Sequence, residues 1–236
     1  LAVEAGLMTT AQADEVNQLQ QVMDKRFGDI AVEKGYLTNE QVETLLKKQG
    51  DAYLLFVQSL TEKDIMSLEE IQKEINAYKK AERFTALDVD AIKSSDIDKI
   101  VPVFTKEPTL IPVIKDYIAL TARNLVRFID SNVRVERVQR INEYTGQYIS
   151  SQELEGEFKI FTGFTGDGTG LKCVAEAYAG ELFDTVDEDA LDAACEFLNC
   201  NNGLFATKLS MEDVELDMLP PVMYGQATTV HSEGSM

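Results

Sequence analysis

The chain has 236 residues, a formal net charge of −19 and a hydrophobic content of 44%. This length accommodates one or two domains that each bury a core of their own. A surface this acidic repels phosphate backbones and anionic lipid headgroups, so nucleic acids and membrane surfaces are poor candidates as partners. No apolar run approaches the ~20 residues of a membrane helix and no signal peptide is recognisable, so we expect a cytoplasmic protein.

The first 80 residues are expected to form helices that repeat with a period of 29 residues. Residues 1–20 align with 30–49, where they share an Ala-Val-Glu triplet, a glycine and a threonine. A weaker third copy, 65–78, aligns with the end of the second. Repeated units that cannot bury their apolar face alone usually stack on one another. The sequence therefore predicts a helical repeat domain over residues 1–80.

The second and third copies carry signals for helix starts and stops. Thr38 and Ser67 each precede a helical pattern, with a glutamine or glutamate three residues later, the spacing of a capping box. Gly35 is expected to end the preceding helix. Asp64 stands at the equivalent position of the third copy, where we expect different turn chemistry.

A less regular stretch, 81–109, separates the repeat from the rest of the chain. It contains Pro102 and Pro108 among acidic residues, and proline is unfavourable inside a helix or a central strand. We therefore interpret 81–109 as a linker, with a domain boundary near residue 100, and 110–236 as the second domain.

The second domain mixes helical and strand patterns, which predicts an α+β fold. Residues 111–129 have helical periodicity, and 158–164 are rich in β-forming residues. The valines within 133–138 also suggest strand-like pieces. Further helices are expected from about Leu171 and from about Asp187.

The three cysteines form neither a disulfide framework nor a zinc-binding motif. The only histidine, His231, lies near a polar tail, so we expect no metal site and no Cys/His nucleophilic pair. Cys195 falls on the apolar face of a predicted helix, where it is best explained as a small core residue.

One face of the helix after Asp187 carries the most informative pattern. At 100° per residue, four positions fall within a sector of about 60°, and these are Asp192, Glu196, Asn199 and Gly203. The two carboxylates repel each other at i, i+4, and asparagine and glycine are poor helix formers. Such a stripe is either a solvated polar face or a surface shaped for a partner.

This stripe resembles the signature of the CheC/CheX/FliY phosphatases. The signature has an acidic residue or serine, then a glutamate four positions later, an asparagine three positions after that, and a proline about two dozen residues on. The chain supplies these as Asp192, Glu196, Asn199 and Pro221. Residues 158–166, 171–183 and 220–225 are similar to the segments that flank the signature in that family.

The resemblance implies a CheX-like domain with long helices packed on a small, mostly antiparallel sheet, preceded by the all-α repeat domain. The implied activity is dephosphorylation of an aspartyl-phosphorylated CheY-like response regulator in bacterial chemotaxis or related two-component signalling. Asn199 would orient the attacking water and Glu196 would engage the regulator's active-site lysine. Asp192, Gly203 and Pro221 would contact the partner. No cofactor of its own is implied, because the receiver domain supplies Mg²⁺, and a homodimer is left open.

The chain departs from the family in two places. The family has a strand between the Thr-Gly loop and the next helix, whereas residues 166–170 pass almost directly to Leu171. The family also continues with strands after its Pro-Pro segment. The sheet is therefore expected to be smaller, or completed by a partner chain or by a segment outside this sequence.

The repeat has a resemblance of its own. Residues 26–49 are similar to the 24-residue motif in the N-terminal domain of type II secretion and pilus ATPases, which bind cyclic di-GMP with two tandem motifs. In that case Arg26 would contact phosphate. A purely structural repeat is the other interpretation. Two alternative functions thus stay open: receiver docking without catalysis, and sensing of a second messenger.

Overall fold

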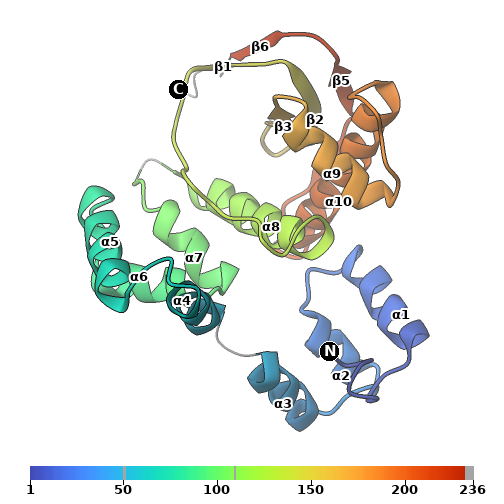
Figure 1. Ribbon diagram of the computed structural model, residues 1–236. Coiled ribbons are helices and arrows are strands. Elements are labelled where there is room, and N and C mark those ends of the chain that lie inside the picture. The colour runs from blue at the N-terminus through green and yellow to red at the C-terminus, as the bar shows by residue number, and fades with distance from the viewer. Residues whose placement is uncertain (50–51, 109, 232–236) are drawn as a thin grey trace. The chain divides into compact units, whose positions relative to one another are not determined.

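The computed structural model describes residues 1–49, 52–108 and 110–231 (Figure 1). Its contacts divide the chain into two compact units. Unit 1 comprises residues 1–20 and 25–115, and unit 2 comprises residues 21–24 and 116–236. The division into a repeat domain, a linker and a second domain stays a prediction, because compactness alone does not establish independent folding.

Helices form all the regular secondary structure in the described residues of unit 1 (Figure 1). Its helices are α1 (Thr10–Gln20), α2 (Phe27–Glu33), α3 (Asn39–Gln49), α4 (Ala52–Glu62), α5 (Leu68–Ala81), α6 (Ala86–Lys93) and α7 (Ile97–Phe104). The apolar core of the first two repeat copies consists of Met8, Val16, Ile30, Ala31, Leu37 and Leu45. The all-α character that we predicted for this part of the chain is confirmed.

The 29-residue period is visible in the caps of the helices. The backbone N–H of Thr38 donates to Gln41 Oε1 at 2.8 Å, and the backbone N–H of Gln41 donates to Thr38 Oγ1 at 3.2 Å. Thr9 makes the same reciprocal pair with its own glutamine one period earlier. Ser67 makes it with Glu70 one period later. The predicted capping boxes are therefore confirmed, and each satisfies two backbone donors at a helix start.

The turn before each cap also repeats. Gly6, Gly35 and Asp64 all have left-handed backbone conformations, with φ of 69°, 74° and 51°. The N–H of Gly35 donates to Val32 O at 2.9 Å, and the N–H of Asp64 makes the equivalent bond to Thr61 O at 3.2 Å. Our expectation of different turn chemistry at Asp64 was wrong. Aspartate is one of the few non-glycine side chains that tolerate this conformation, so the turn survives the substitution.

Two helices, α6 and α7, lie within the stretch 81–109 that we interpreted as a linker. Pro102 is inside α7, where we expected proline to be unfavourable. Its neighbours Val101 and Val103 are buried, whereas Pro102 itself is exposed. The hydrogen bond that proline removes is therefore lost on the solvent side, and burial of the two valines offsets it.

Unit 2 combines helices with two small antiparallel sheets. Its helices are α8 (Pro112–Phe128, in unit 2 from residue 116), α9 (Thr169–Ala179) and α10 (Glu188–Ser210). Its strands are β1 (Glu143–Gly146), β2 (Tyr148–Gly156), β3 (Ile160–Gly166), β4 (Leu216–Met218), β5 (Val222–Tyr224) and β6 (Thr228–His231). The predicted α+β fold class is confirmed.

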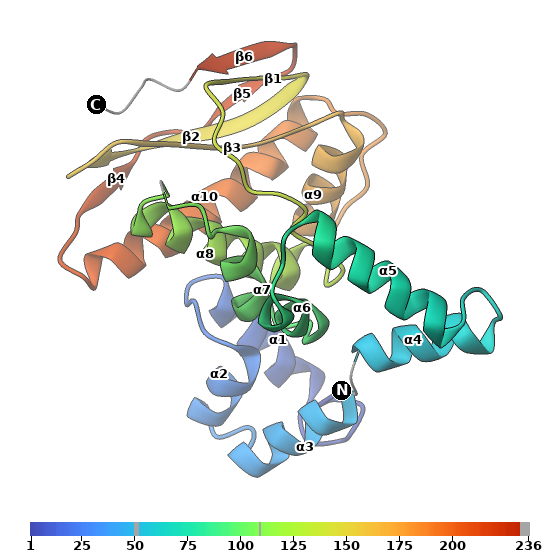
Figure 2. The same ribbon diagram turned by 90° about the vertical axis from the view of Figure 1, so that its left-hand side faces the viewer.

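Strand β2 is the centre of the larger sheet. It pairs with β3 along one edge and with β4 and β5 along the other, and all three pairings are antiparallel. A separate two-stranded sheet joins β1 to β6. Helices α8, α9 and α10 cover one side of the larger sheet (Figure 2). The predicted strand at 158–164 is confirmed as β3, but 133–138 forms no strand. Strand β2 was not predicted, because its buried residues Ser150, Ser151 and Gln152 are polar.

The chain after Pro221 contributes two strands to the structure. Both β5 and β6 follow it. No strand lies between β3 and α9, as the sequence indicated. Within the described ranges, no helix combines the length and the apolar character needed to cross a bilayer.

Candidate functional site

Helix α10 positions the polar stripe. Asp187 caps its start by accepting a hydrogen bond from the N–H of Ala190 at 3.1 Å, and Glu188 and Asp189 lie in its first turn, where acidic groups are favoured. The apolar side of the helix is buried, with Leu191 at 5%, Cys195 at 1% and Leu198 at 0% exposure. The predicted orientation of the helix is thus confirmed, and the stripe lies at the edge of this buried side.

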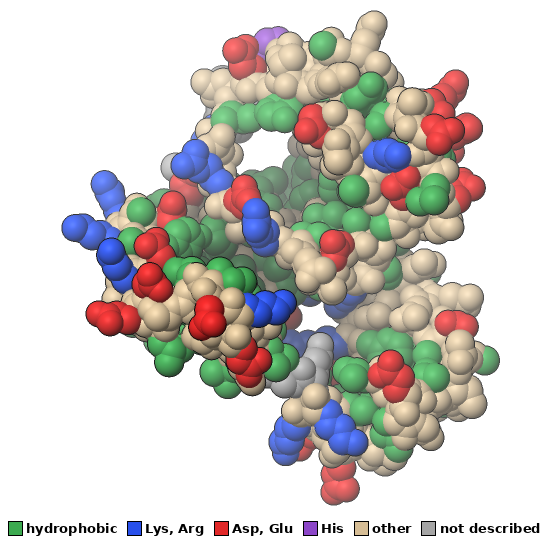
Figure 3. Space-filling model, in the orientation of Figure 1, with side chains coloured by type: hydrophobic (Ala, Val, Ile, Leu, Met, Phe, Trp, Pro, Cys, Tyr) green, Lys and Arg blue, Asp and Glu red, His purple; other side chains and the backbone are tan. Residues whose placement is uncertain are grey.

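Asp192 and Glu196 are exposed, and Asn199 is half-buried. Tyr178, Ala179 and Glu181 from α9 and the turn after it line an open depression of about 400 Å³ together with Asp189, Asp192, Ala193 and Glu196 from α10. Four of these seven lining residues are acidic and none is Lys or Arg, so the depression attracts cations. Figure 3 shows acidic side chains gathered over the part of unit 2 that Figure 1 labels α9 and α10.

Tyr178 is one of the residues that line this depression. Burial, together with the neighbouring Cys200 thiol and the charge of Glu196, raises the pKa of its hydroxyl. Its ring packs against Phe197 at a centroid distance of 5.4 Å. Tyr178 therefore lines the acidic depression as a neutral phenol near neutral pH.

The Asn199 side chain is held on one side. Its Oδ1 accepts a hydrogen bond from Gln152 Nε2 at 2.9 Å. No hydrogen bond within the described residues involves its Nδ2, and the described residues contain no buried side-chain nitrogen that lacks a hydrogen-bond partner. The Nδ2 group is therefore open to solvent, and Asn199 presents a hydrogen-bond donor beside Glu196.

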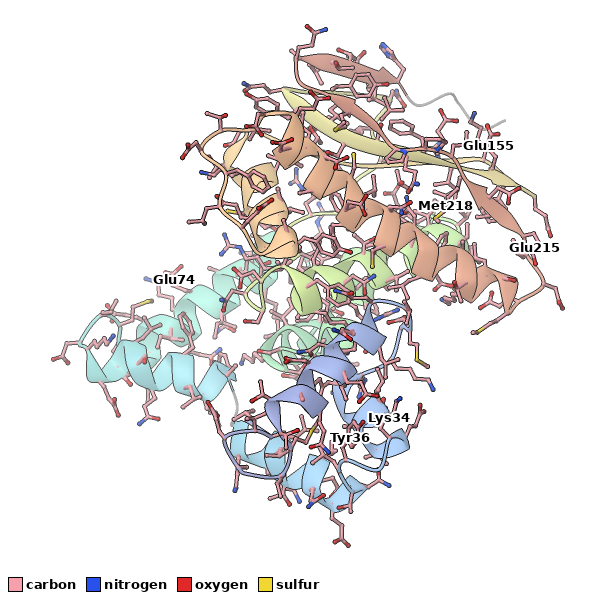
Figure 4. All side chains as sticks on the ribbon, turned by 90° about the vertical axis from the view of Figure 1, so that its right-hand side faces the viewer. Lys34, Tyr36, Glu74, Glu155, Glu215 and Met218 are labelled. Carbon is pink, nitrogen blue, oxygen red and sulfur yellow. The ribbon has the colours of Figure 1, made fainter. Side chains whose placement is uncertain are left out.

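Of the two remaining predicted partner contacts, Gly203 lies in α10 and Pro221 lies between β4 and β5. A Cβ atom on Gly203 would lie 3.7 Å from Met218 Cε, so this side chain of β4 already covers the glycine (Figure 4). Pro221 is exposed in the segment that joins β4 to β5. Leu219 anchors that segment, because its N–H donates to Glu153 O at 2.9 Å and its carbonyl accepts from Gln152 Nε2 at 2.8 Å.

Sequence reasoning missed a buried polar network behind the stripe. Asn202 is fully buried, and its Nδ2 donates to Gln152 Oε1 at 2.7 Å and to Thr162 Oγ1 at 2.9 Å. The Tyr117 hydroxyl donates to Asn202 Oδ1 at 2.8 Å. The Asn-Asn pair at 201–202 in mid-helix was a usable signal, because asparagine is unfavourable there without partners. Gln152 carried no comparable signal.

A second buried set joins α10 to α8. Asn124 Nδ2 donates to Asn201 Oδ1 at 2.9 Å, and both side chains are fully buried. Nearby, Asp24 bonds to Arg123 Nη2 at 2.6 Å and to Arg127 Nη1 at 2.7 Å. Burial alone would raise the pKa of Asp24, but the two guanidinium groups lower it overall. These contacts join α10 to α8 and the segment 21–24 to α8, and none of them involves a residue of the stripe.

The two cysteines of α10, Cys195 and Cys200, are poor candidates for a nucleophile. All three are free, and Cys195 is buried as predicted. Burial raises the pKa of the Cys195 and Cys200 thiols, which disfavours the reactive thiolate. Among the described residues, no cluster of three or more His, Cys, Asp or Glu side chains is placed to hold a metal ion.

The candidate phosphate contact in unit 1 is already paired. Arg26 precedes α2, and its Nη2 lies 3.2 Å from Asp98 Oδ2. A pocket of about 320 Å³ in the repeat is lined mostly by apolar residues, including Phe27, Leu37 and Leu45. Nothing in these contacts favours an anionic ligand, so binding of cyclic di-GMP stays a prediction.

No family model and no curated protein sequence matches the chain. Several solved structures are similar to it. A chemotaxis protein CheX from Desulfovibrio desulfuricans is 18% identical, with a TM-score of 0.44 over 51% of this chain and 83% of that one. A CheC-like superfamily protein from Shewanella sp. PV-4 is 20% identical, with a TM-score of 0.45 over 53% and 84%. A CheX–CheY–BeF₃–Mg²⁺ complex from Borrelia burgdorferi is 18% identical, with a TM-score of 0.37 over 53% and 93%.

Proposed function

We propose that unit 2 dephosphorylates the aspartyl phosphate of a CheY-like receiver domain in bacterial chemotaxis or related two-component signalling. One observation carries the proposal. Asn199 presents a free amide donor one helical turn from the exposed carboxylate of Glu196, which lines an acidic depression. The sequence signature shared with the CheC/CheX/FliY phosphatases supplies the substrate class.

The reaction needs positioning more than it needs a protein nucleophile. Water attacks the phosphorus atom, the bond between phosphorus and the aspartate oxygen breaks, and inorganic phosphate and a free carboxylate result. Holding the water in line with the breaking bond provides most of the acceleration. Asn199 Nδ2 donates to one lone pair of this water and leaves the other free to attack. The partner's receiver domain supplies the Mg²⁺ that neutralises the phosphoryl oxygens.

The depression serves docking. Its carboxylates, with Glu196 nearest to Asn199, are complementary to a lysine ammonium on the receiver. Asp192 and Glu181 add negative charge around the same contact. Pro221, exposed on the neighbouring segment, provides an apolar contact for the partner. Its ring loses almost no side-chain conformational entropy when the partner binds. In this scheme Glu196 sets the register that brings the phosphoryl group to Asn199.

Phosphate release tests the proposal. Receiver domains of the source organism are charged with acetyl phosphate, and release is followed above their own rate of hydrolysis. The protein should accelerate release from at least one receiver, and Asn199→Ala should remove that acceleration. Binding to the same receiver loaded with beryllofluoride is measured in parallel. Binding without any acceleration would replace catalysis by the docking-only alternative.

A further inference from the structure

We propose that Gln152 is a positioning residue that fixes Asn199 as an outward-facing hydrogen-bond donor and couples it to the segment before Pro221. Gln152 lies on the central strand β2, and only 2% of it is exposed. Its catalytic consequence rests on the proposed function, whereas the orientation that it imposes on Asn199 does not.

The polarity of the network starts at a backbone carbonyl. The carbonyl oxygen of Gln152 can only accept, so the Thr162 hydroxyl, 3.0 Å away, must donate to it. Thr162 Oγ1 therefore accepts from its other neighbour, Asn202, which must turn its Nδ2 toward it. The oxygen of that amide, Asn202 Oδ1, then accepts a hydrogen bond from the Tyr117 hydroxyl. Thr162 thus sets the orientation of Asn202, and the Tyr117 hydroxyl, which can donate or accept, is compatible with it.

The same logic determines Gln152 and Asn199. Because Asn202 Nδ2 is a donor, Gln152 must meet it with Oε1, and its Nε2 then faces Asn199 and the carbonyl of Leu219. That carbonyl can only accept, so it requires the same orientation of Gln152. Asn199 is therefore forced to turn Oδ1 inward and Nδ2 outward. The side-chain amide of Gln152 makes three hydrogen bonds in this orientation. Reversing the amide would disrupt all three of them, which costs free energy in a buried site.

Two consequences follow for the site. The outward group of Asn199 donates to an oxygen, such as that of a water or a phosphoryl group, and does not accept from a partner's ammonium group. The two bonds from Nε2 also connect Asn199 to Leu219, so the amide and the segment before Pro221 move as one unit. Loss of Gln152 should consequently affect the chemical step, while docking through Glu196 persists.

The test compares Gln152→Glu and Gln152→Leu with Tyr117→Phe. The control removes one hydrogen bond from the same network, but Thr162 and Leu219 still orient Gln152. We expect both Gln152 variants to lower kcat at least tenfold with KM changed less than about threefold, since one positioned polar group is worth about one to three orders of magnitude in rate. Tyr117→Phe should keep kcat within about twofold of the wild-type value. Its thermal midpoint should nevertheless fall about as far as that of the Gln152 variants.

A pH profile separates positioning from simple loss of structure. The carboxylate introduced by Gln152→Glu cannot donate to Asn199, but its protonated form can donate one hydrogen bond. The kcat of this variant relative to wild type should therefore recover as the pH is lowered from about 9 to about 6, because burial favours the protonated form. Gln152→Leu should show no recovery.

A readout without turnover keeps the inference independent of the enzymatic assignment. In ¹⁵N-labelled protein the Asn199 side-chain protons, assigned by their loss in Asn199→Ala, should exchange rapidly with solvent in wild type and in Tyr117→Phe. They should exchange at least tenfold more slowly in Gln152→Glu at high pH, where the amide turns inward. Unchanged exchange and unchanged kcat in folded Gln152 variants would overturn the inference. If the wild-type protein released no phosphate, the proposed function would be wrong. The exchange rates would then decide by themselves whether Gln152 orients Asn199.

Discussion

The two units differ in the range over which their polar side chains act. In unit 1 the repeated hydrogen bonds are local, because Thr9, Thr38 and Ser67 each cap a helix through a residue three positions away. In unit 2 the decisive bonds are long-range, since Asn202 joins Gln152, 50 positions away, and Tyr117, 85 positions away. Local bonds define single helices, whereas long-range bonds define how helices and strands meet. Function is expected where the long-range network reaches the surface, at Asn199.

The largest effect is expected from Asn199→Ala. This change removes the proposed water-holding donor but little buried apolar surface, so unit 2 should stay folded. Phosphate release should fall about ten- to a thousandfold, since such a group is worth roughly 1.4 to 4 kcal/mol in a transition state. Single-turnover kinetics measures the loss and circular dichroism checks the fold. Undiminished release from the true receiver would show that the long-range network does not serve catalysis.

Asn202→Ala should have the largest effect on stability. It leaves Gln152 Oε1, the Thr162 hydroxyl and the Tyr117 hydroxyl each without one buried partner, and each such loss costs about 1 to 3 kcal/mol. Urea denaturation should show unit 2 destabilised by about 3 kcal/mol or more, with the helices of unit 1 unaffected. The matched change Asn132→Ala, on an exposed residue whose side chain bonds to Asp130 two positions away, should cost much less. Equal costs would contradict the special role of the network.

Glu196→Ala should weaken docking more than it changes the fold, because Glu196 is exposed and its proposed partner is a cation on the receiver. We expect a loss of roughly three- to tenfold in affinity at low salt, and most of it should disappear near ~1 M salt, where charges are screened. Calorimetry with a beryllofluoride-loaded receiver measures both. Asp192→Ala is the control in the same depression and should be mild. A salt-independent loss would mean that the glutamate acts by something other than its charge.

The smallest effect is expected in unit 1. Ser67→Ala removes the cap of α5 and should cost about 1 kcal/mol of stability, while phosphate release by unit 2 stays unchanged. The thermal midpoint of Ser67→Ala is compared with that of Ser59→Ala, which removes a hydroxyl within α4. The difference between the two measures the contribution of the cap. A change in release after Ser67→Ala would break the comparison, because a purely local bond would then act on a distant site.

Local signals made much of the fold and part of the site predictable. The caps at Thr38 and Ser67, the turn at Gly35 and the orientation of α10 all follow from residues within one or two turns of each other. The same is true of the stripe itself, because helical spacing alone places Glu196 and Asn199 on one face. Signals of this range survive in a sequence because the interacting groups are near neighbours in it.

The tertiary structure alone decided which way Asn199 faces and what holds it. Strand β2 was not recognised, because Ser150, Ser151 and Gln152 are polar yet buried, and their partners come from segments far along the chain. Hydrophobic periodicity registers apolar burial and is silent about polar groups that are buried with partners. The sequence by itself thus determined that a glutamate and an asparagine share a helix face. Only the packing of that helix on β2 decided that the asparagine presents a donor, because a hydrogen-bond partner 47 positions away fixes its amide.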